Sequence, residues 1–128
     1  MLLYRPFEHH LNVELSKYGL YRAQWSTLSY IYNNGSGTLV DISNYQSVEK
    51  PTVTRTIHRL EEMGYISHAP SKDKREKRMQ LTELGEKVYI DLRATIDQFE
   101  QVILKGISEE EQLETIRIME EIQNNLRE

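Results

Sequence analysis

Apolar residues recur every three to four positions along most of the chain, which is the spacing of one face of an α-helix. The first apolar stripe consists of Leu3, Phe7, Leu11, Leu15 and Tyr18. Pro6 stands near its start and Gly19 just after it, where a helix tolerates a proline and commonly ends at a glycine. The pattern therefore predicts a first helix that ends near residue 18.

The same spacing predicts three more helices before residue 64, at about residues 23–32, 39–45 and 50–63. The run Asn-Asn-Gly-Ser-Gly at residues 33–37 ends the first of them, because these residues favour turns. A tight turn at residues 46–49 separates the other two. The helix after that turn has Val53, Ile57 and Leu60 as its buried stripe and Gly64 as its C-terminal cap.

A β-hairpin is predicted next, because residues 65–69 are strand-like, residues 70–74 favour a turn and residues 77–81 alternate polar and apolar side chains. Thr82 then caps a long helix, and Ser108 to Glu111 has the pattern of a capping box that begins a final helix. The apolar stripes of these two helices are Val88, Leu92, Ile96, Phe99 and Ile103, and then Leu113, Ile116, Met119, Ile122 and Leu126.

The length of 128 residues suits a single domain, residues 1–128, of mainly α (α+β) class. The hydrophobic fraction of 38% is low, and a helical protein of this polarity often completes its core across a dimer interface. Cysteine is absent, which excludes disulfides, thiolate metal sites and cysteine nucleophiles. No apolar run approaches the roughly 18 residues of a membrane span and the start does not resemble a secretory signal, so we expect a cytoplasmic protein.

Charge is unevenly distributed along the chain. The formal net charge is −4, but residues 50–80 carry eight basic and four acidic residues, whereas residues 82–128 carry five basic and twelve acidic residues. Binding to a polyanion requires a local positive face rather than a positive total. The middle of the chain is therefore a candidate nucleic-acid-binding region, with ordinary solvated surface as the alternative.

Two helices joined by a tight turn and followed by a hairpin predict a winged helix-turn-helix at residues 21–82. The second of these helices would place its N-terminal residues against base edges in the major groove of DNA. Its outer face carries Pro51, Thr52, Thr54, Arg55, His58 and Arg59. The hairpin tip, with Lys72, Asp73, Lys74, Arg75 and Lys77, would reach a neighbouring minor groove, whose narrow width concentrates negative potential.

Several of these residues have a structural alternative. Arg55 and Arg59 are four residues apart and repel each other, which favours an anionic partner over a helix-stabilising pair. His58 is either a DNA contact or an ordinary surface residue. The hairpin cations Lys72, Lys74, Lys77 and Arg78 either contact phosphate or are solvated charge.

The chain also resembles the MarR family of bacterial transcriptional regulators. The segments PTVTRTIHRLEEMGYI and SKDKREKRMQLTELGE carry most of the resemblance, and AQWSTL at residues 23–28 is similar to the start of that family's second helix. The wing pattern Asp-x-Arg stands here as Asp73-Lys74-Arg75, and the Leu-Thr-x-x-Gly pattern that ends the wing runs from Leu81 to Gly85.

The resemblance implies a homodimer that binds an inverted-repeat operator and represses transcription until a small molecule releases it. It assigns Arg75 to the minor groove, Asp73 to the shape of the wing, and Thr52, Thr54 and Arg55 to recognition. Residues 1–20 and 83–128 would be dimerisation helices. The expected interface residues are Leu3, Phe7, Leu11, Phe99, Ile103, Ile116, Met119 and Ile122.

Three residues depart from the family pattern. Tyr21 replaces the expected helix-capping Ser or Thr, Ser43 stands where family members often have Ala, and Glu49 precedes the recognition helix. Near phosphates, the Glu49 carboxylate would repel DNA unless it caps the helix.

Other candidate chemistry is weaker. Tyr18, Trp25 and Tyr30 either pack in the core or line an effector pocket. His9 and His10 are adjacent and so do not face one another on a helix, and we expect no metal site and no cofactor. No nucleophile motif, phosphate-binding glycine loop or carboxylate pair indicates an enzyme. The alternative function is a winged-helix protein-interaction module without specific DNA binding.

Overall fold

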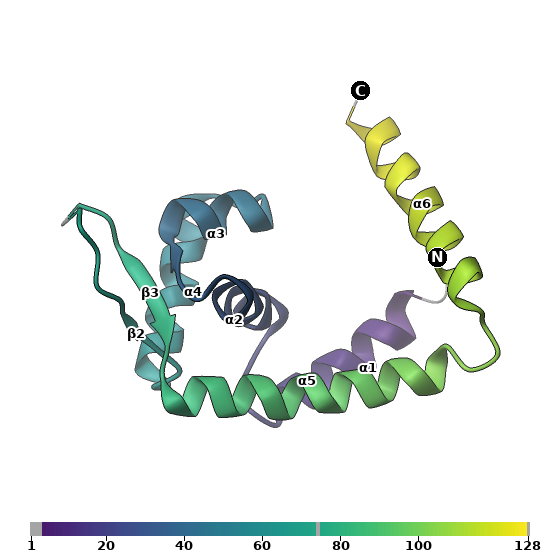
Figure 1. The fold of residues 1–128 in the computed structure, drawn as a ribbon, viewed down its shortest axis with the longest axis horizontal. Coiled ribbons are helices and arrows are strands. Elements are labelled where there is room, and N and C mark those ends of the chain that lie inside the picture. Colours follow the sequence, from purple (N-terminus) through teal and green to yellow (C-terminus); the bar gives the residue numbers. More distant parts are fainter. Residues whose placement is uncertain (1–3, 74, 128) are drawn as a thin grey trace. The chain divides into compact units, whose positions relative to one another are not determined.

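The computed structural model describes residues 4–73 and 75–127, with residues 4–8 described by their main chain alone. Leu3 and Lys74 therefore lie outside the described residues, and of Phe7 only the main chain is described. The helices are α1 (Tyr4–Ser16), α2 (Arg22–Asn34), α3 (Leu39–Gln46), α4 (Lys50–Glu62), α5 (Glu83–Ile103) and α6 (Glu109–Leu126). The strands are β1 (Gly37–Thr38), β2 (Ile66–His68) and β3 (Arg78–Leu81) (Figure 1).

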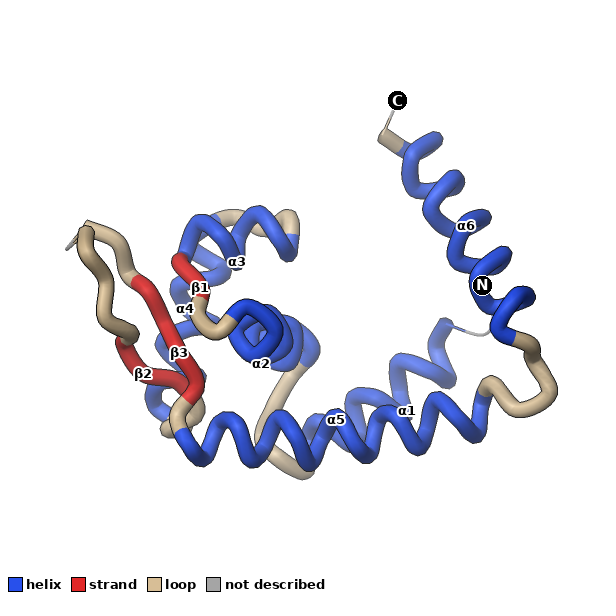
Figure 2. Tube along the Cα trace, viewed as in Figure 1, coloured by secondary structure: helices blue, strands red, loops and turns tan. Residues whose placement is uncertain are grey.

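The chain divides into two compact units, Met1–Ile96 and Asp97–Glu128. The first contains a winged helix-turn-helix, with α3 and α4 as the helix pair and β2 and β3 as the wing. This confirms the predicted fold class and helix order. Figure 2 shows the hairpin of β2 and β3 extending beyond the strands into a long loop, which carries the charged tip.

The sheet contains one strand more than the predicted hairpin. Sequence patterns assigned residues 33–37 to a turn, whereas Gly37 and Thr38 form β1 and pair antiparallel with β3, giving the strand order β1-β3-β2. The Thr38 hydroxyl accepts a hydrogen bond from the Asp41 N–H at 3.1 Å and so also caps α3. Two residues are too few to show an alternating pattern, so this strand leaves no periodic signal in the sequence.

The helix ends follow the predicted signals. Gly19 and Gly64 both adopt positive φ, at 73° and 81°, three residues after the end of α1 and two residues after the end of α4. The Thr82 hydroxyl accepts from the Gly85 N–H at 3.0 Å and caps α5. At α2 the Tyr21 side chain makes no cap, and instead the Gln24 side chain accepts from the Tyr21 N–H at 2.8 Å.

The predicted apolar stripes meet in one hydrophobic core in the first unit. Leu15 from α1, Leu28 and Ile31 from α2, Val53 from α4 and Leu92 from α5 have no exposed surface. The other core members are Leu20, Ile42, Ile57, Leu60, Ile66, Met79, Val88 and Tyr89. This core holds α4 and the wing to the same body and fixes which side of each faces outward.

The second unit contains the C-terminal end of α5 and all of α6. Ser108 and Glu111 form the predicted capping box, with the Glu111 N–H donating to the Ser108 hydroxyl at 3.1 Å and the Ser108 N–H donating to the Glu111 carboxylate at 2.9 Å. The second of these bonds lowers the pKa of the Glu111 carboxyl. No residue of α6 is buried, so its apolar stripe is exposed. Among the described residues, no helix is long and apolar enough to cross a membrane.

Candidate nucleic-acid interface

Helix α4 has a buried face and an exposed face, as its sequence predicts. Val53, Ile57 and Leu60 are at most 3% exposed. Thr56 is also buried, and its hydroxyl donates to the Thr52 carbonyl at 3.1 Å. The predicted outer residues all retain contact with solvent: Pro51, Arg55, His58 and Arg59 are exposed, and Thr52 and Thr54 are half-buried.

The two arginines of this outer face differ in their surroundings. Arg59 forms an ion pair with Glu62 at 3.5 Å, within the same helix. The Arg55 guanidinium instead lies 3.4 Å from the Thr52 hydroxyl, and no described carboxylate lies within ion-pair distance of it. Its positive charge is therefore uncompensated within the described residues, which suits contact with an anion or with guanine.

The turn before α4 is held by main-chain and side-chain hydrogen bonds. The Ser43 hydroxyl donates to the Val48 carbonyl at 2.6 Å, a bond that Ala at this position would lack. Ser47 adopts the left-handed conformation, with φ of 55°. Glu49 is the N-cap residue of α4, but its side chain makes no capping bond. The Glu49 carboxylate therefore does not cap α4.

The wing tip is shaped by hydrogen bonds around Asp73. Its carboxylate accepts from the Arg75 N–H at 2.9 Å, and its main-chain carbonyl accepts from the Glu76 N–H at 3.1 Å. The Ser71 hydroxyl lies 3.0 Å from the Glu76 carboxylate. These bonds give the tip a defined conformation that leaves Lys72, Arg75 and Lys77 exposed.

Arg78 has a role that the sequence did not indicate. Its guanidinium donates to the Ser36 hydroxyl at 3.0 Å and to the Glu76 carboxylate at 3.0 Å. Its charge is therefore paired within the protein rather than freely solvated, and contact of its remaining donors with phosphate stays a prediction. Arg78 ties the wing to the loop between α2 and β1, across 42 positions of sequence.

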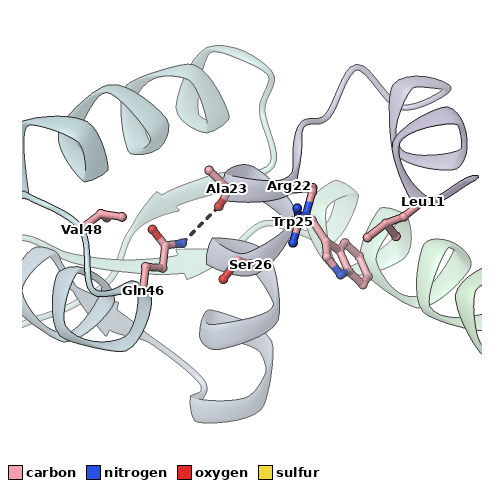
Figure 3. Close-up of a pocket in the computed structure, with 7 residues that line it drawn as sticks. All are labelled: Leu11, Arg22, Ala23, Trp25, Ser26, Gln46 and Val48. Carbon is pink, nitrogen blue, oxygen red and sulfur yellow. Dashed lines mark hydrogen bonds between the residues drawn. The ribbon is translucent and has the colours of Figure 1, made fainter. Parts of the chain in front are cut away.

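A hollow of about 370 Å³ opens between α1, the start of α2 and the turn that precedes α4. Its lining residues are Leu11, Arg22, Ala23, Trp25, Ser26, Gln46 and Val48 (Figure 3). The Gln46 amide spans one side, donating to the Ala23 carbonyl at 3.1 Å and to the Thr27 hydroxyl at 2.9 Å. The Trp25 indole stacks on the Tyr89 ring, with centroids 4.9 Å apart.

Of the three aromatic residues considered for an effector pocket, Trp25 alone lines this hollow. Tyr18 packs against the core, and its carbonyl accepts from the Tyr65 hydroxyl at 3.0 Å. The Tyr30 ring packs against the Tyr45 ring, with centroids 5.1 Å apart, and lies over Gly37. Among the described side chains, no three His, Asp or Glu residues are grouped so that they could hold a metal ion.

The fold and the exposed α4 face define a winged helix-turn-helix protein. The sequence model of the MarR family matches residues 20–77. A Bacillus subtilis (strain 168) relative, described as an uncharacterised HTH-type transcriptional regulator YwoH, is 41% identical over 100 residues, covering 78% of this chain and 73% of the relative. The chain therefore belongs to the MarR family and is a transcriptional regulator rather than an enzyme.

Solved structures agree with this assignment. A Staphylococcus aureus MarR in complex with salicylate and kanamycin superposes with a TM-score of 0.84 at 31% identity, covering 98% of this chain and 85% of that one. A mutant MarR from E. coli complexed with operator DNA has the same fold, with a TM-score of 0.81 at 23% identity over 94% of this chain and 88% of that one.

Proposed function

We propose that the protein is a homodimeric repressor that binds an inverted-repeat operator through α4 and the wing and is released by a small-molecule effector. The observation that carries the DNA-binding part is the uncompensated Arg55 on the exposed face of α4, in the same compact unit as a wing tip with exposed Lys72, Arg75 and Lys77. This activity requires access to chromosomal DNA, so we expect the protein to act in the cytoplasm.

Within this proposal, α4 enters the major groove and reads bases. Arg55 supplies a bidentate contact to guanine, while Thr52, Thr54 and Pro51 allow close approach of the helix. Arg59, His58 and Lys50 contribute phosphate contacts. Arg75 enters the minor groove from the wing, and Lys72 and Lys77 contact the flanking phosphates.

Dimerisation is supported by the apolar surface of the second unit. Ile116, Met119 and Ile122 are each more than 50% exposed, on a helix with no buried residue. A symmetric dimer built from residues 1–20 and 83–128 would bury this stripe, together with Phe99 and Ile103. Two recognition helices would then reach major grooves about one helical turn apart, roughly 34 Å, on a pseudo-palindrome.

The hollow beside Trp25 is the candidate effector site. Its volume of about 370 Å³ falls within the usual range for small-molecule pockets. A ligand there would contact Gln46, which connects the end of α3 to α2 directly before the turn into α4. Displacing this amide would change the position of the recognition helix, which provides a route to release. The similar S. aureus MarR is complexed with salicylate and kanamycin, which supports small-molecule control in this family.

Selection from random duplex DNA with purified protein tests the proposal. We expect enrichment of an inverted repeat with half-sites about 10 bp apart. Weak, salt-sensitive binding without an enriched repeat would instead favour the protein-interaction module, with the acidic C-terminal helices as its surface. Screening for compounds that release the selected operator, and repeating the assay with a Gln46→Ala variant, then tests the effector route.

A further inference from the structure

Glu49 is an acidic residue at the front of a helix that the proposed function brings to DNA. Its main-chain φ and ψ are −69° and 148°, the extended conformation of an N-cap residue. Its carbonyl accepts from the Thr52 N–H at 3.1 Å and the Val53 N–H at 3.3 Å. The carboxylate makes no capping bond, so helix capping does not account for an acidic side chain here.

The carboxylate is also not neutralised within the described part of the chain. The Glu49 side chain is exposed, and no described Lys, Arg or His lies within ion-pair distance of it. Placed near DNA phosphates, this charge weakens every complex, whatever the base sequence. This cost is offset at the correct sequence if the carboxylate accepts a hydrogen bond from a base.

The position of Glu49 relative to Arg55 indicates which base this is. Glu49 is the N-cap residue directly before α4, Thr52 follows it by three residues, and the Arg55 guanidinium lies 3.4 Å from the Thr52 hydroxyl. The Arg55 guanidinium therefore lies beside the residue one turn after Glu49, near the start of α4. In the major groove, a carboxylate accepts a hydrogen bond from the cytosine N4 amino group, while arginine donates to guanine O6 and N7.

We propose that Glu49 is a specificity-determining residue that selects cytosine beside the guanine read by Arg55. This inference rests on the proposed function, because it requires α4 to lie in the major groove. Thymine and guanine present acceptor oxygens in that groove, and adenine presents the acceptor N7 beside its amino group, so the carboxylate is repelled at each of these three bases. Glu49 thus favours the correct base by attraction and disfavours phosphates and wrong bases by repulsion, so it raises specificity at the expense of general DNA affinity.

The test compares base preferences of the wild type, Glu49→Gln and Glu49→Ala by selection from random duplex DNA. Glutamine pairs with adenine N6 and N7, so Glu49→Gln should move the preference from cytosine to adenine. Glu49→Ala should abolish the preference, which amounts to about fivefold or more per half-site. Both variants should bind random duplex more tightly than the wild type. Glu120→Gln, on α6, is the control for the change in net charge.

The outcomes separate this inference from the proposed function. If the wild type enriches no inverted repeat, the proposed function fails, and this inference fails with it. If the wild type enriches a repeat but both Glu49 variants retain the same base at every position, the proposed function stands and the base-reading role is wrong. In that case, if the variants bind random duplex DNA more tightly than the wild type, Glu49 only repels DNA and has no sequence preference.

Discussion

Gly85, in the first turn of α5, packs against the main-chain carbonyl of Tyr65 so closely that a Cβ atom at position 85 would overlap the carbonyl oxygen. The Tyr65 carbonyl also accepts from the Thr82 N–H at 3.1 Å, so the start of α5 and the start of the wing are joined at this point. The last residue of the Leu-Thr-x-x-Gly pattern therefore has a steric reason to be glycine.

Gly85→Ala should lower the free energy of unfolding by about 2–3 kcal/mol, because the added methyl group meets rigid backbone rather than a side chain that can move. Urea denaturation followed by circular dichroism measures this change. Gly35→Ala is the matched control, since Gly35 has φ of 81° and no atom within 4 Å of an added Cβ. Gly35→Ala should lower the free energy of unfolding only through backbone strain, by about 1 kcal/mol. Equal losses in the two variants would contradict the steric explanation.

Arg55→Ala should weaken operator binding by about 1–3 kcal/mol, with a much smaller effect on random DNA, because the variant cannot hydrogen-bond to guanine. Arg59→Ala is the comparison: its guanidinium is paired with Glu62 and should contact only phosphate, so both kinds of DNA should be bound more weakly by the same factor. Fluorescence anisotropy with both duplexes at fixed salt gives the two ratios. An equal effect of Arg55→Ala on both duplexes would make Arg55 a phosphate contact as well.

Lys72→Ala or Lys77→Ala should flatten the salt dependence of DNA binding by roughly one unit of log–log slope for each phosphate that the lysine neutralises in a protomer. The physical reason is that a lysine bound to a phosphate releases a counterion from the DNA. Lys87→Ala, an exposed lysine on α5, serves as the control and should leave the slope unchanged. An unchanged slope in the wing variants would show that these lysines are solvated charge and do not contact phosphate.

If the protein forms the proposed dimer, Ile116→Glu should convert it to a monomer without unfolding the chain. The side chain is 51% exposed and no residue of α6 is buried, so within one chain the substitution disturbs no core. Across a dimer interface it would place an uncompensated charge in an apolar surface. Light scattering reports the mass and circular dichroism the helix content, with Glu120→Gln on the same helix as the control. If the variant remains dimeric, the apolar stripe of α6 is not part of the dimer interface.

Glu111 makes a pH-dependent contribution to the stability of the first turn of α6. Its pKa is lowered chiefly by the hydrogen bond from the Ser108 N–H and further by the Ser108 hydroxyl. A lowered pKa in the folded state means that the ionised cap stabilises the helix at neutral pH and that this stabilisation is lost as the pH falls through the acidic range. The difference in helix stability between wild type and Glu111→Gln, followed by amide exchange at 109–112, should therefore shrink on acidification. If the difference between wild type and Glu111→Gln does not change with pH, ionisation of Glu111 does not contribute to the stability of this helix start.

Most of the fold follows from local signals in the sequence. Val53, Ile57 and Leu60 define the inner side of α4 by their spacing alone, and that spacing also places Arg55 on the outer side. The capping residues Thr82 and Ser108 mark the starts of α5 and α6 through bonds that span three residues. Such contacts depend on a few adjacent positions, so the sequence predicts them without knowledge of the rest of the chain.

Contacts between distant positions required the tertiary structure. The sequence does not show that Arg78 joins the wing to the loop after α2, because its partner there, Ser36, is 42 residues away. The stack of Trp25 on Tyr89 and of Tyr89 on Tyr32 likewise joins α2 to α5. The hollow beside Gln46 exists only where α1, α2 and the turn before α4 meet.

Local patterns in the sequence are enough to predict the order of the helices, the wing and the exposed face of α4, because periodicity and capping act within one or two helical turns. Four features depend on the packed chain: β1 joins the sheet, Arg78 binds the loop before β1, Gly85 admits the Tyr65 carbonyl, and the Glu49 carboxylate makes no capping bond to α4. These outcomes depend on which distant groups come into reach after the core has packed, and no local pattern contains that information.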